Sequence, residues 1–169
     1  MKANIRFRLN GEEKECLVEP NLTLLDLLRD RLQVTSPKKS CQRGECGACT
    51  VLLNGKAVNS CLVLAVSVDG KEVETVESLG TKELHPIQRH FQELGASQCG
   101  YCTPGMILAA KAIIDKNPDP TVEEIKEGLS GNLCRCTGYV KIIEAVLAAA
   151  KEMREMRQDA KGLAKEECP

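Results

Sequence analysis

The stretch CQRGECGACT, residues 41–50, decides the fold of this chain. Its cysteines follow the spacing C-x4-C-x2-C, and one more comes after eleven further residues, which gives the set Cys41, Cys46, Cys49 and Cys61. Plant-type [2Fe–2S] centres are ligated with this spacing. Gly44 and Gly47 lie between the cysteines, where a residue without a Cβ lets the backbone approach an inorganic core and adopt a positive φ. Neighbouring N–H groups can then stabilise an anionic cluster, so the loop predicts a [2Fe–2S] site.

A second group of four cysteines lies in the C-terminal half, at Cys99, Cys102, Cys134 and Cys136. The first pair comes directly before a helix start at Thr103-Pro104. The second pair lies in GNLCRCTG, residues 131–138, before the last predicted helix. Helix N-termini favour thiolates and negatively charged clusters. This group therefore predicts a second centre held by four thiolates.

Structural zinc is the alternative for both groups. Zinc sites favour paired C-x2-C knuckles, and the four-residue gap between Cys41 and Cys46 fits them poorly. Taken alone, the four thiolates of the second group suit either metal, but a plant-type centre in the same chain favours iron there too. A Rieske-type centre is not supported, because the only two histidines, His85 and His90, do not share a helix face. We expect both histidines to be exposed polar residues.

Residues 1–78 have the pattern of short strands joined in hairpins around one helix. Three turn dipeptides separate the strand-like runs: Asn10-Gly11, Asn54-Gly55 and Asp69-Gly70. The third turn implies strands over residues 62–68 and 72–76. Thr23 stands before an apolar stripe and predicts the start of an amphipathic helix. This half therefore reads as an α+β domain.

The rest of the chain changes to helical periodicity. Four helix starts are predicted, at Pro86, Thr103, Thr121 and about Tyr139. Short connections between four helices predict a small bundle. The weakly patterned residues 77–83 contain the boundary, so we expect domains over residues 1–78 and 79–157. Charged residues dominate the end of the chain, and we expect residues 158–169 to be a mobile tail.

Composition excludes several other classes of protein. The chain has 169 residues, a formal net charge of −1 and four aromatic residues, so it lacks the basic and stacking surface of a nucleic-acid-binding protein. The N-terminal MKANIRFRL is no signal peptide, and the apolar runs are too short for a membrane span. Thiolates that hold metal belong in a reducing compartment, which predicts a cytoplasmic protein.

No motif of a catalytic site is present, whether a Ser/His/Asp set, a phosphate-binding loop or a dinucleotide fingerprint. We expect the chain to move electrons without a substrate-transforming site of its own. Two cysteines remain outside the metal groups. Cys16 is expected to be a small apolar strand residue, and Cys168 a free thiol in the tail.

Three segments, residues 41–50, 98–106 and 131–139, resemble the iron–sulfur subunit of the molybdenum hydroxylases. This family includes xanthine dehydrogenase, aldehyde oxidoreductase and carbon monoxide dehydrogenase. The resemblance implies a β-grasp ferredoxin-like [2Fe–2S] domain followed by a four-helix bundle that binds a second [2Fe–2S] cluster. It also implies an electron relay through both clusters, between a molybdopterin centre and FAD on partner subunits. Ser40 departs from the glycine that many relatives place before the first ligand.

By the same resemblance, the cluster of the helical domain lies next to the pterin, which Gln98 and Cys136 approach. The cluster of the ferredoxin-like domain lies nearer the flavin. The implied partners are a large molybdopterin-binding subunit and an FAD-binding medium subunit, in a higher hetero-oligomer. The substrate, whether a purine or other N-heterocycle, an aldehyde, carbon monoxide or an aromatic thioester, is determined by the molybdenum subunit.

Overall fold

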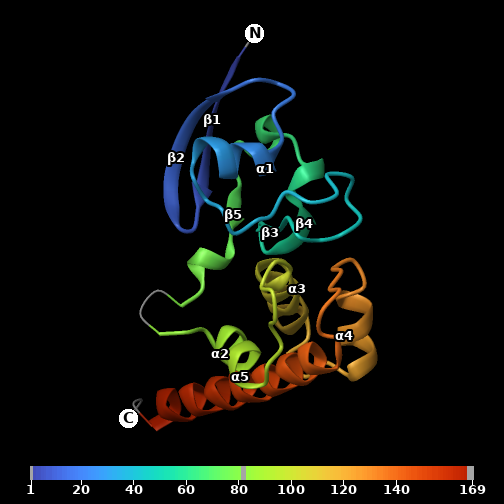
Figure 1. Ribbon diagram of the computed structural model, residues 1–169. Helices are drawn as coiled ribbons and strands as arrows, with labels where there is room; N and C mark the ends of the chain where they lie inside the picture. The colour runs from blue at the N-terminus through green and yellow to red at the C-terminus, as the bar shows by residue number, and fades with distance from the viewer. Residues whose placement is uncertain (1, 81–82, 167–169) are drawn as a thin grey trace.

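The computed structural model describes residues 2–80 and 83–166 of the chain. Figure 1 shows a sheet unit, formed by the N-terminal half, stacked on a helical unit formed by the C-terminal half. The sheet unit contains these strands and helical turns: β1 (Ala3–Leu9), β2 (Glu12–Val18), α1 (Leu24–Asp26), η1 (Leu27–Arg31), β3 (Thr50–Leu53), β4 (Lys56–Asn59), η2 (Ser60–Leu62), η3 (Ala65–Val68), β5 (Glu72–Glu74) and η4 (Val76–Ser78). The helical unit contains α2 (Pro86–Glu93), α3 (Thr103–Lys116), α4 (Val122–Gly128) and α5 (Val140–Glu166).

The strands of residues 2–80 form one five-stranded mixed sheet in the order β2-β1-β5-β3-β4. β1 and β5 are parallel, and the other neighbours are antiparallel. Two of the predicted hairpin turns are confirmed, at Asn10-Gly11 and Asn54-Gly55. All four of these residues have positive φ, the conformation that two-residue hairpins of right-handed twist require.

The core of the sheet unit lies between the sheet and the predicted helix. Ile5, Phe7 and Leu9 alternate along β1 and are buried against Leu24 and Leu28. Thr23 begins the helix as predicted, since its hydroxyl accepts a hydrogen bond from the N–H of Asp26. After one turn the helix continues in π-helical geometry as η1, which the sequence pattern did not predict.

One predicted strand is wrong. Residues 62–68 were expected to pair with β5, but most of this segment forms the 3-10 turns η2 and η3. Ala65 and Val68 are the buried residues of η3, and their spacing of three places both on one face of a 3-10 turn. The backbone instead pairs with the segment before α1, through hydrogen bonds from Leu24 N–H to Val63 and from Ala65 N–H to Leu22. Together these features describe a β-grasp fold in which 3-10 turns, rather than a strand, precede β5.

The four helices of residues 83–166 pack around a core of small and aliphatic side chains. Met106 and Ala110 of α3 are fully buried together with Ala145, Val146 and Ala149 of α5. The predicted helix start at Thr121 is confirmed, and it forms a capping box with reciprocal hydrogen bonds between Thr121 and Glu124. Figure 1 shows α5 lying across the end of the unit that faces away from the sheet.

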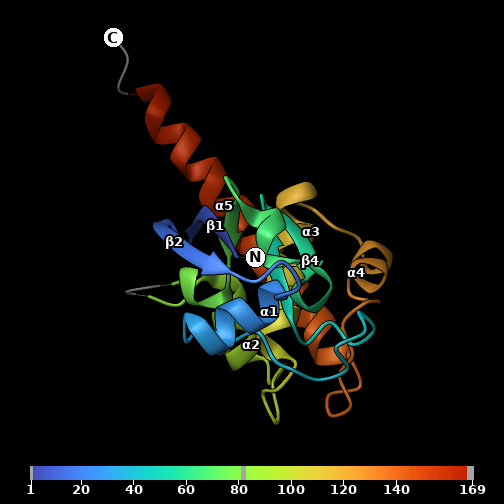
Figure 2. The same cartoon turned by 90° about the horizontal axis from the view of Figure 1, so that it is seen from above.

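Helix α5 is longer than predicted. It continues to Glu166, so residues 158–166 are helical although we assigned them to a mobile tail. Figure 2 shows the C-terminal part of this helix extending beyond the rest of the molecule. Cys168, the predicted free thiol, lies outside the described residues. No helix within residues 2–80 and 83–166 combines the length and apolar character needed to cross a membrane.

The prediction that both histidines are exposed is wrong. His85 is the N-cap of α2, and its Nδ1 accepts a hydrogen bond from the N–H of Ile87. His90 Nε2 lies 2.8 Å from a carboxylate oxygen of Glu152, and only 17 % of its side chain is exposed. Both imidazoles therefore stabilise α2 and its contact with α5. Cys16 is half-buried on β2 and packs against the core of the sheet unit.

Candidate metal centres

The first cysteine loop, between η1 and β3, folds irregularly through residues with left-handed backbone. Gln42, Gly44 and Gly47 have φ values of 52°, 80° and 67°. This path turns the N–H of Arg43 toward the sulfur of Cys41, at an N to Sγ distance of 3.4 Å. The pKa of Cys41 is lowered to about 6. The main cause is the hydrogen bond from Arg43 N–H, followed by bonds from the thiol and N–H of Cys46 and from the N–H of Glu45. Such a site favours a thiolate near neutral pH.

The four sulfurs of the sheet unit approach one another in two pairs. The thiols of Cys41 and Cys46 interact, and so do those of Cys49 and Cys61, while Cys41 has a weaker effect on Cys61. Cys49 and Cys61 are buried with Leu25, and burial followed by the neighbouring thiol of Cys49 raises the pKa of Cys61 to about 11. Cys61 lies on η2, directly after β4.

The second set of sulfurs lies where α3 begins and in the loop before α5. Cys102 is the N-cap residue of α3, while Cys134 and Cys136 lie on the loop. The sulfurs again pair: those of Cys99 and Cys136 are 3.6 Å apart, and those of Cys102 and Cys134 interact. Burial and then the thiol of Cys134 raise the pKa of Cys102 to about 12. Cys99 and Cys136 are exposed at the surface.

Hydrogen bonds stabilise the anionic form of Cys134. Burial opposes its ionisation, but bonds from the hydroxyl and N–H of Thr137 and the N–H of Cys136 outweigh burial and lower its pKa. The neighbouring thiol of Cys99 raises the pKa of Cys136. Each set of sulfurs thus contains groups that favour the thiolate and groups that become thiolates only when a cation replaces the proton.

The paired sulfurs fit a two-iron cluster, in which each iron takes two thiolates. The chemistry of the donors supports the same fit, since all eight are thiols and the loops present N–H and hydroxyl groups to them.

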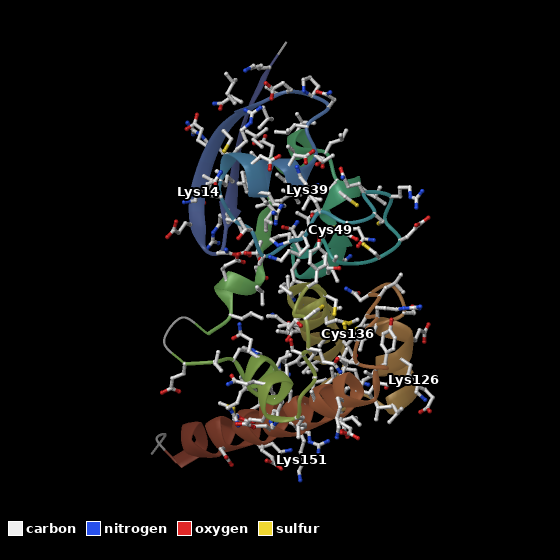
Figure 3. All side chains as sticks on the ribbon, viewed as in Figure 1. Lys14, Lys39, Cys49, Lys126, Cys136 and Lys151 are labelled. Carbon is white, nitrogen blue, oxygen red and sulfur yellow. The ribbon has the colours of Figure 1, made fainter. Side chains whose placement is uncertain are left out.

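The two cysteine loops are in direct contact although they belong to different units. The N–H of Leu133 donates to the carbonyl oxygen of Cys46 over 2.9 Å. The side-chain amide of Asn132, which is buried, donates to Gly47 O at 3.0 Å and to Thr50 Oγ1 at 3.1 Å. Figure 3 shows Cys49 at the lower edge of the sheet unit and Cys136 at the facing edge of the helical unit.

The contact between the loops depends on glycine. A Cβ at Gly47 would lie 2.4 Å from the backbone oxygen of Gly131, and one at Gly105 would lie 2.4 Å from Gly47 O. A Cβ at Gly44 would instead meet the flexible side chain of Leu62 at 2.3 Å. Only at Gly47 do positive φ and close contact with another backbone coincide at the junction of the loops.

The remaining predicted site residue, Gln98, is exposed next to Cys99. Sequence reasoning missed four residues that shape the sites without holding metal: Asn132, Leu133, Thr137 and Tyr139. Tyr139 has a φ of 69°, and its hydroxyl accepts a hydrogen bond from Cys134 N–H at 2.8 Å. The only sequence signal for these residues is their position close to the cysteines predicted to be ligands.

Two families match the chain. One, described as a 2Fe-2S iron-sulfur cluster binding domain, matches residues 7–79. The other, described as a [2Fe-2S] binding domain, matches residues 75–147. The chain therefore contains two [2Fe–2S]-binding domains in series, which agrees with its two sets of paired sulfurs.

Named relatives are similar along almost their whole length. The chain is 54 % identical over 153 residues to the nicotinate dehydrogenase small FeS subunit of Eubacterium barkeri, covering 89 % of this chain and 96 % of the relative. It is 47 % identical over 148 residues to the nicotine 6-hydroxylase small subunit of Paenarthrobacter nicotinovorans, covering 88 % of this chain and 90 % of the relative.

Solved structures share the fold. One chain of quinoline 2-oxidoreductase from Pseudomonas putida 86 matches with a TM-score of 0.87 and 42 % identity, covering 91 % of this chain and 97 % of that one. Aldehyde oxidoreductase from Desulfovibrio gigas matches with a TM-score of 0.88 and 37 % identity, covering 91 % of this chain but 17 % of that longer one. The sequence motifs, the two-unit fold and these relatives agree: the chain belongs to the family of small [2Fe–2S] iron–sulfur subunits of the molybdenum hydroxylases, and it is a subunit of an oxidoreductase complex.

Proposed function

We propose that this chain relays single electrons between a molybdopterin centre and FAD, both held by partner subunits. The observation that carries the proposal is the direct contact between the two cysteine loops, through Leu133 N–H and Cys46 O. A subunit that only stores metal has no need to bring two separately folded sites together. A relay does, because electron transfer between centres requires them to be close.

The proposed ligands are the two paired sets of thiols. Cys41, Cys46, Cys49 and Cys61 hold the cluster of the sheet unit, and Cys99, Cys102, Cys134 and Cys136 hold that of the helical unit. Each cluster, when bound, accepts and gives up one electron at a time. Gly44 and Gly47 let the first loop curve around its cluster with N–H groups turned inward.

The chain's own residues fix the spacing between the sites. Cys46 is a proposed ligand in one unit, and Leu133 is the neighbour of the proposed ligand Cys134 in the other. Their 2.9 Å hydrogen bond therefore joins the two ligand loops by backbone atoms alone. The buried side-chain amide of Asn132 stabilises the same junction by donating a hydrogen bond to Gly47 O. Rigid loops of this kind need little rearrangement when the charge of a site changes.

The two sites differ in access, which supports an order along the relay. Cys99 and Cys136 are exposed, and so is Gln98 beside them, whereas Cys49 and Cys61 are buried. We place the molybdopterin of the large subunit against the exposed site, next to Gln98 and Cys136. The sheet-unit site then lies toward the FAD of the medium subunit. The assembly is a cytoplasmic hetero-oligomer.

Metal and sulfide analysis of the anaerobically purified chain tests the ligand part of this proposal. We expect about four iron and four acid-labile sulfide per chain, from two two-iron clusters. Bound zinc without sulfide would contradict it and support a structural module. Purification of the complex from its native source tests the relay. A molybdopterin-containing and a flavin-containing subunit should copurify, whereas a lone two-cluster chain would indicate an independent ferredoxin.

A further inference from the structure

A threonine hydroxyl in the helical unit is bonded to one of the proposed ligand sulfurs. Thr137 Oγ1 lies 3.2 Å from Cys134 Sγ, and the hydroxyl donates to the sulfur. Thr137 is half-buried in the loop before α5, one residue after Cys136. At the sheet-unit site, by contrast, the bond to Cys41 Sγ comes from the backbone N–H of Arg43. Both sites have main-chain donors, and the helical unit adds a side-chain hydroxyl to them.

The loop directs the single hydroxyl proton of Thr137 at the sulfur. The N–H of Tyr139 donates to Thr137 Oγ1 over 3.3 Å and thereby occupies a lone pair of that oxygen. Gly138 and Tyr139 both have left-handed backbone, with φ values of 64° and 69°, which turns the Tyr139 N–H back toward Thr137. A left-handed tyrosine is unfavourable by itself, so the surrounding contacts must hold it there.

Tyr139 also holds the backbone on the other side of Cys134. The N–H of Cys134 donates to the Tyr139 hydroxyl at 2.8 Å, and that hydroxyl in turn donates to Asn132 O at 3.4 Å. The N–H of Cys134 is thus used in closing the loop. The N–H groups of Thr137 and Cys136 bond to the Cys134 sulfur, and the Thr137 hydroxyl adds a side-chain donor to them.

We propose that Thr137 is a positioning residue that raises the reduction potential of the helical-unit cluster through its hydrogen bond to Cys134. A reduced cluster carries one more negative charge than the oxidised one, and a donor to a ligand sulfur stabilises the more negative state. The hydroxyl therefore makes the helical unit a better electron acceptor than the same thiolates without it. This inference rests on the proposed ligand role of Cys134.

The test compares three variants of the full chain in reductive titrations followed by electron paramagnetic resonance. Thr137→Val removes the hydroxyl at nearly constant volume, and Thr137→Ser keeps it. Thr103→Val is the matched control, because Thr103 follows the ligand Cys102 but its hydroxyl bonds to Ser97 at 2.9 Å. We expect Thr137→Val to shift the reduction equilibrium of the helical-unit cluster about tenfold toward the oxidised form, a fall of about 59 mV for one electron. Thr137→Ser and Thr103→Val should stay near wild type, and so should the sheet-unit cluster in all variants.

An unchanged potential in a fully loaded Thr137→Val variant would overturn the inference, as would an equal shift in Thr103→Val. Loss of the second cluster from Thr137→Val, with Thr137→Ser loaded normally, would also overturn it, because the hydroxyl would then serve assembly rather than potential. Failure of the proposed function gives a different result, since the wild-type chain itself would then not contain two clusters.

Discussion

The backbone N–H of Leu133 donates a 2.9 Å hydrogen bond to the carbonyl oxygen of Cys46, and this bond joins the two cysteine loops of the molecule. Cys46 is a proposed ligand of the sheet-unit cluster, and Leu133 directly precedes a proposed ligand of the helical-unit cluster. The junction is made by main-chain atoms, so no side-chain substitution removes it directly. Its supports, Asn132 and Gly47, are open to mutation.

Asn132→Ala removes the buried amide that bonds to Gly47 O and Thr50 Oγ1. Two lost hydrogen bonds should lower the free energy of unfolding by about 1–3 kcal/mol, as measured by urea denaturation of the loaded chain. The magnetic interaction between the reduced clusters should weaken as well. Asn59→Ala is the control, since Asn59 bonds to Gly44 O within the sheet unit alone. An equal loss of magnetic interaction in both variants would contradict the role given to Asn132.

Gly47→Ala introduces a methyl group at a positive φ against the backbone of Gly131. Gly55→Ala is the matched control, because its φ is also positive but its Cβ would meet nothing within 4 Å. In both variants the left-handed alanine should lower the free energy of unfolding by about 1–2 kcal/mol. In Gly47→Ala the clash should lower the free energy of unfolding by about 1–3 kcal/mol more and break the contact between the units. Equal losses of unfolding free energy would show that the loops do not need this close approach.

Cys136→Ser should change one cluster and spare the other. Cys136 pairs with Cys99, and the thiols that shift its pKa, those of Cys99 and Cys134, both belong to the helical unit. We expect one of two rhombic resonance signals to be altered or lost and the other to be unchanged. Circular dichroism of the same sample controls for unfolding, because metal binding and folding are coupled in small domains. Equal loss of both signals in a folded chain would contradict two separate sites.

Acidification should weaken the helical unit through His85. Burial, followed by the charge of Lys111, lowers the pKa of His85 below its ordinary value of 6.5. The folded chain therefore binds this proton less tightly than the unfolded chain. The contribution of neutral His85 to the free energy of unfolding is complete above about pH 6.5 and is lost as the pH falls through the pKa of the folded chain. Protonation also ends the hydrogen bond that Nδ1 accepts from Ile87 N–H.

The measurement is the urea midpoint of wild type and His85→Asn between about pH 7 and about pH 5, since asparagine caps a helix without titrating there. The charged groups that face His85, namely Lys111, Asp115 and Glu152, are present in both proteins. The wild-type midpoint should therefore fall more steeply. Parallel pH profiles would show that the imidazole does not contribute.

Local sequence signals predicted much of the fold. The turns at Asn10-Gly11 and Asn54-Gly55 and the caps at Thr23 and Thr121 depend on residues within a few positions of each other, so the sequence shows them directly. Residues 62–68 were misassigned because alternation of apolar residues cannot reveal that this backbone pairs with the segment before α1. The burial of His90 likewise depends on Glu152, which is distant in sequence.

In the candidate site, too, local patterns could be predicted from the sequence and contacts between distant residues could not. Cysteine spacing identifies the two groups of thiols, because three cysteines of the first group follow one another on one loop and the second group consists of two close pairs. The contact between Cys46 and Leu133 joins residues far apart in the chain and has no local pattern. The left-handed Tyr139 is similarly set by its bonds to Cys134 and Asn132 rather than by its own preference.

The central claim is that this chain carries two one-electron centres, one in each unit, close enough to exchange electrons. The most direct test is electron paramagnetic resonance of the full chain, purified anaerobically and reduced completely with dithionite. Two rhombic signals of equal integrated intensity, with splitting from their mutual interaction, are the predicted result. A single signal, or a colourless chain that stays colourless after reconstitution with iron and sulfide, would contradict the account.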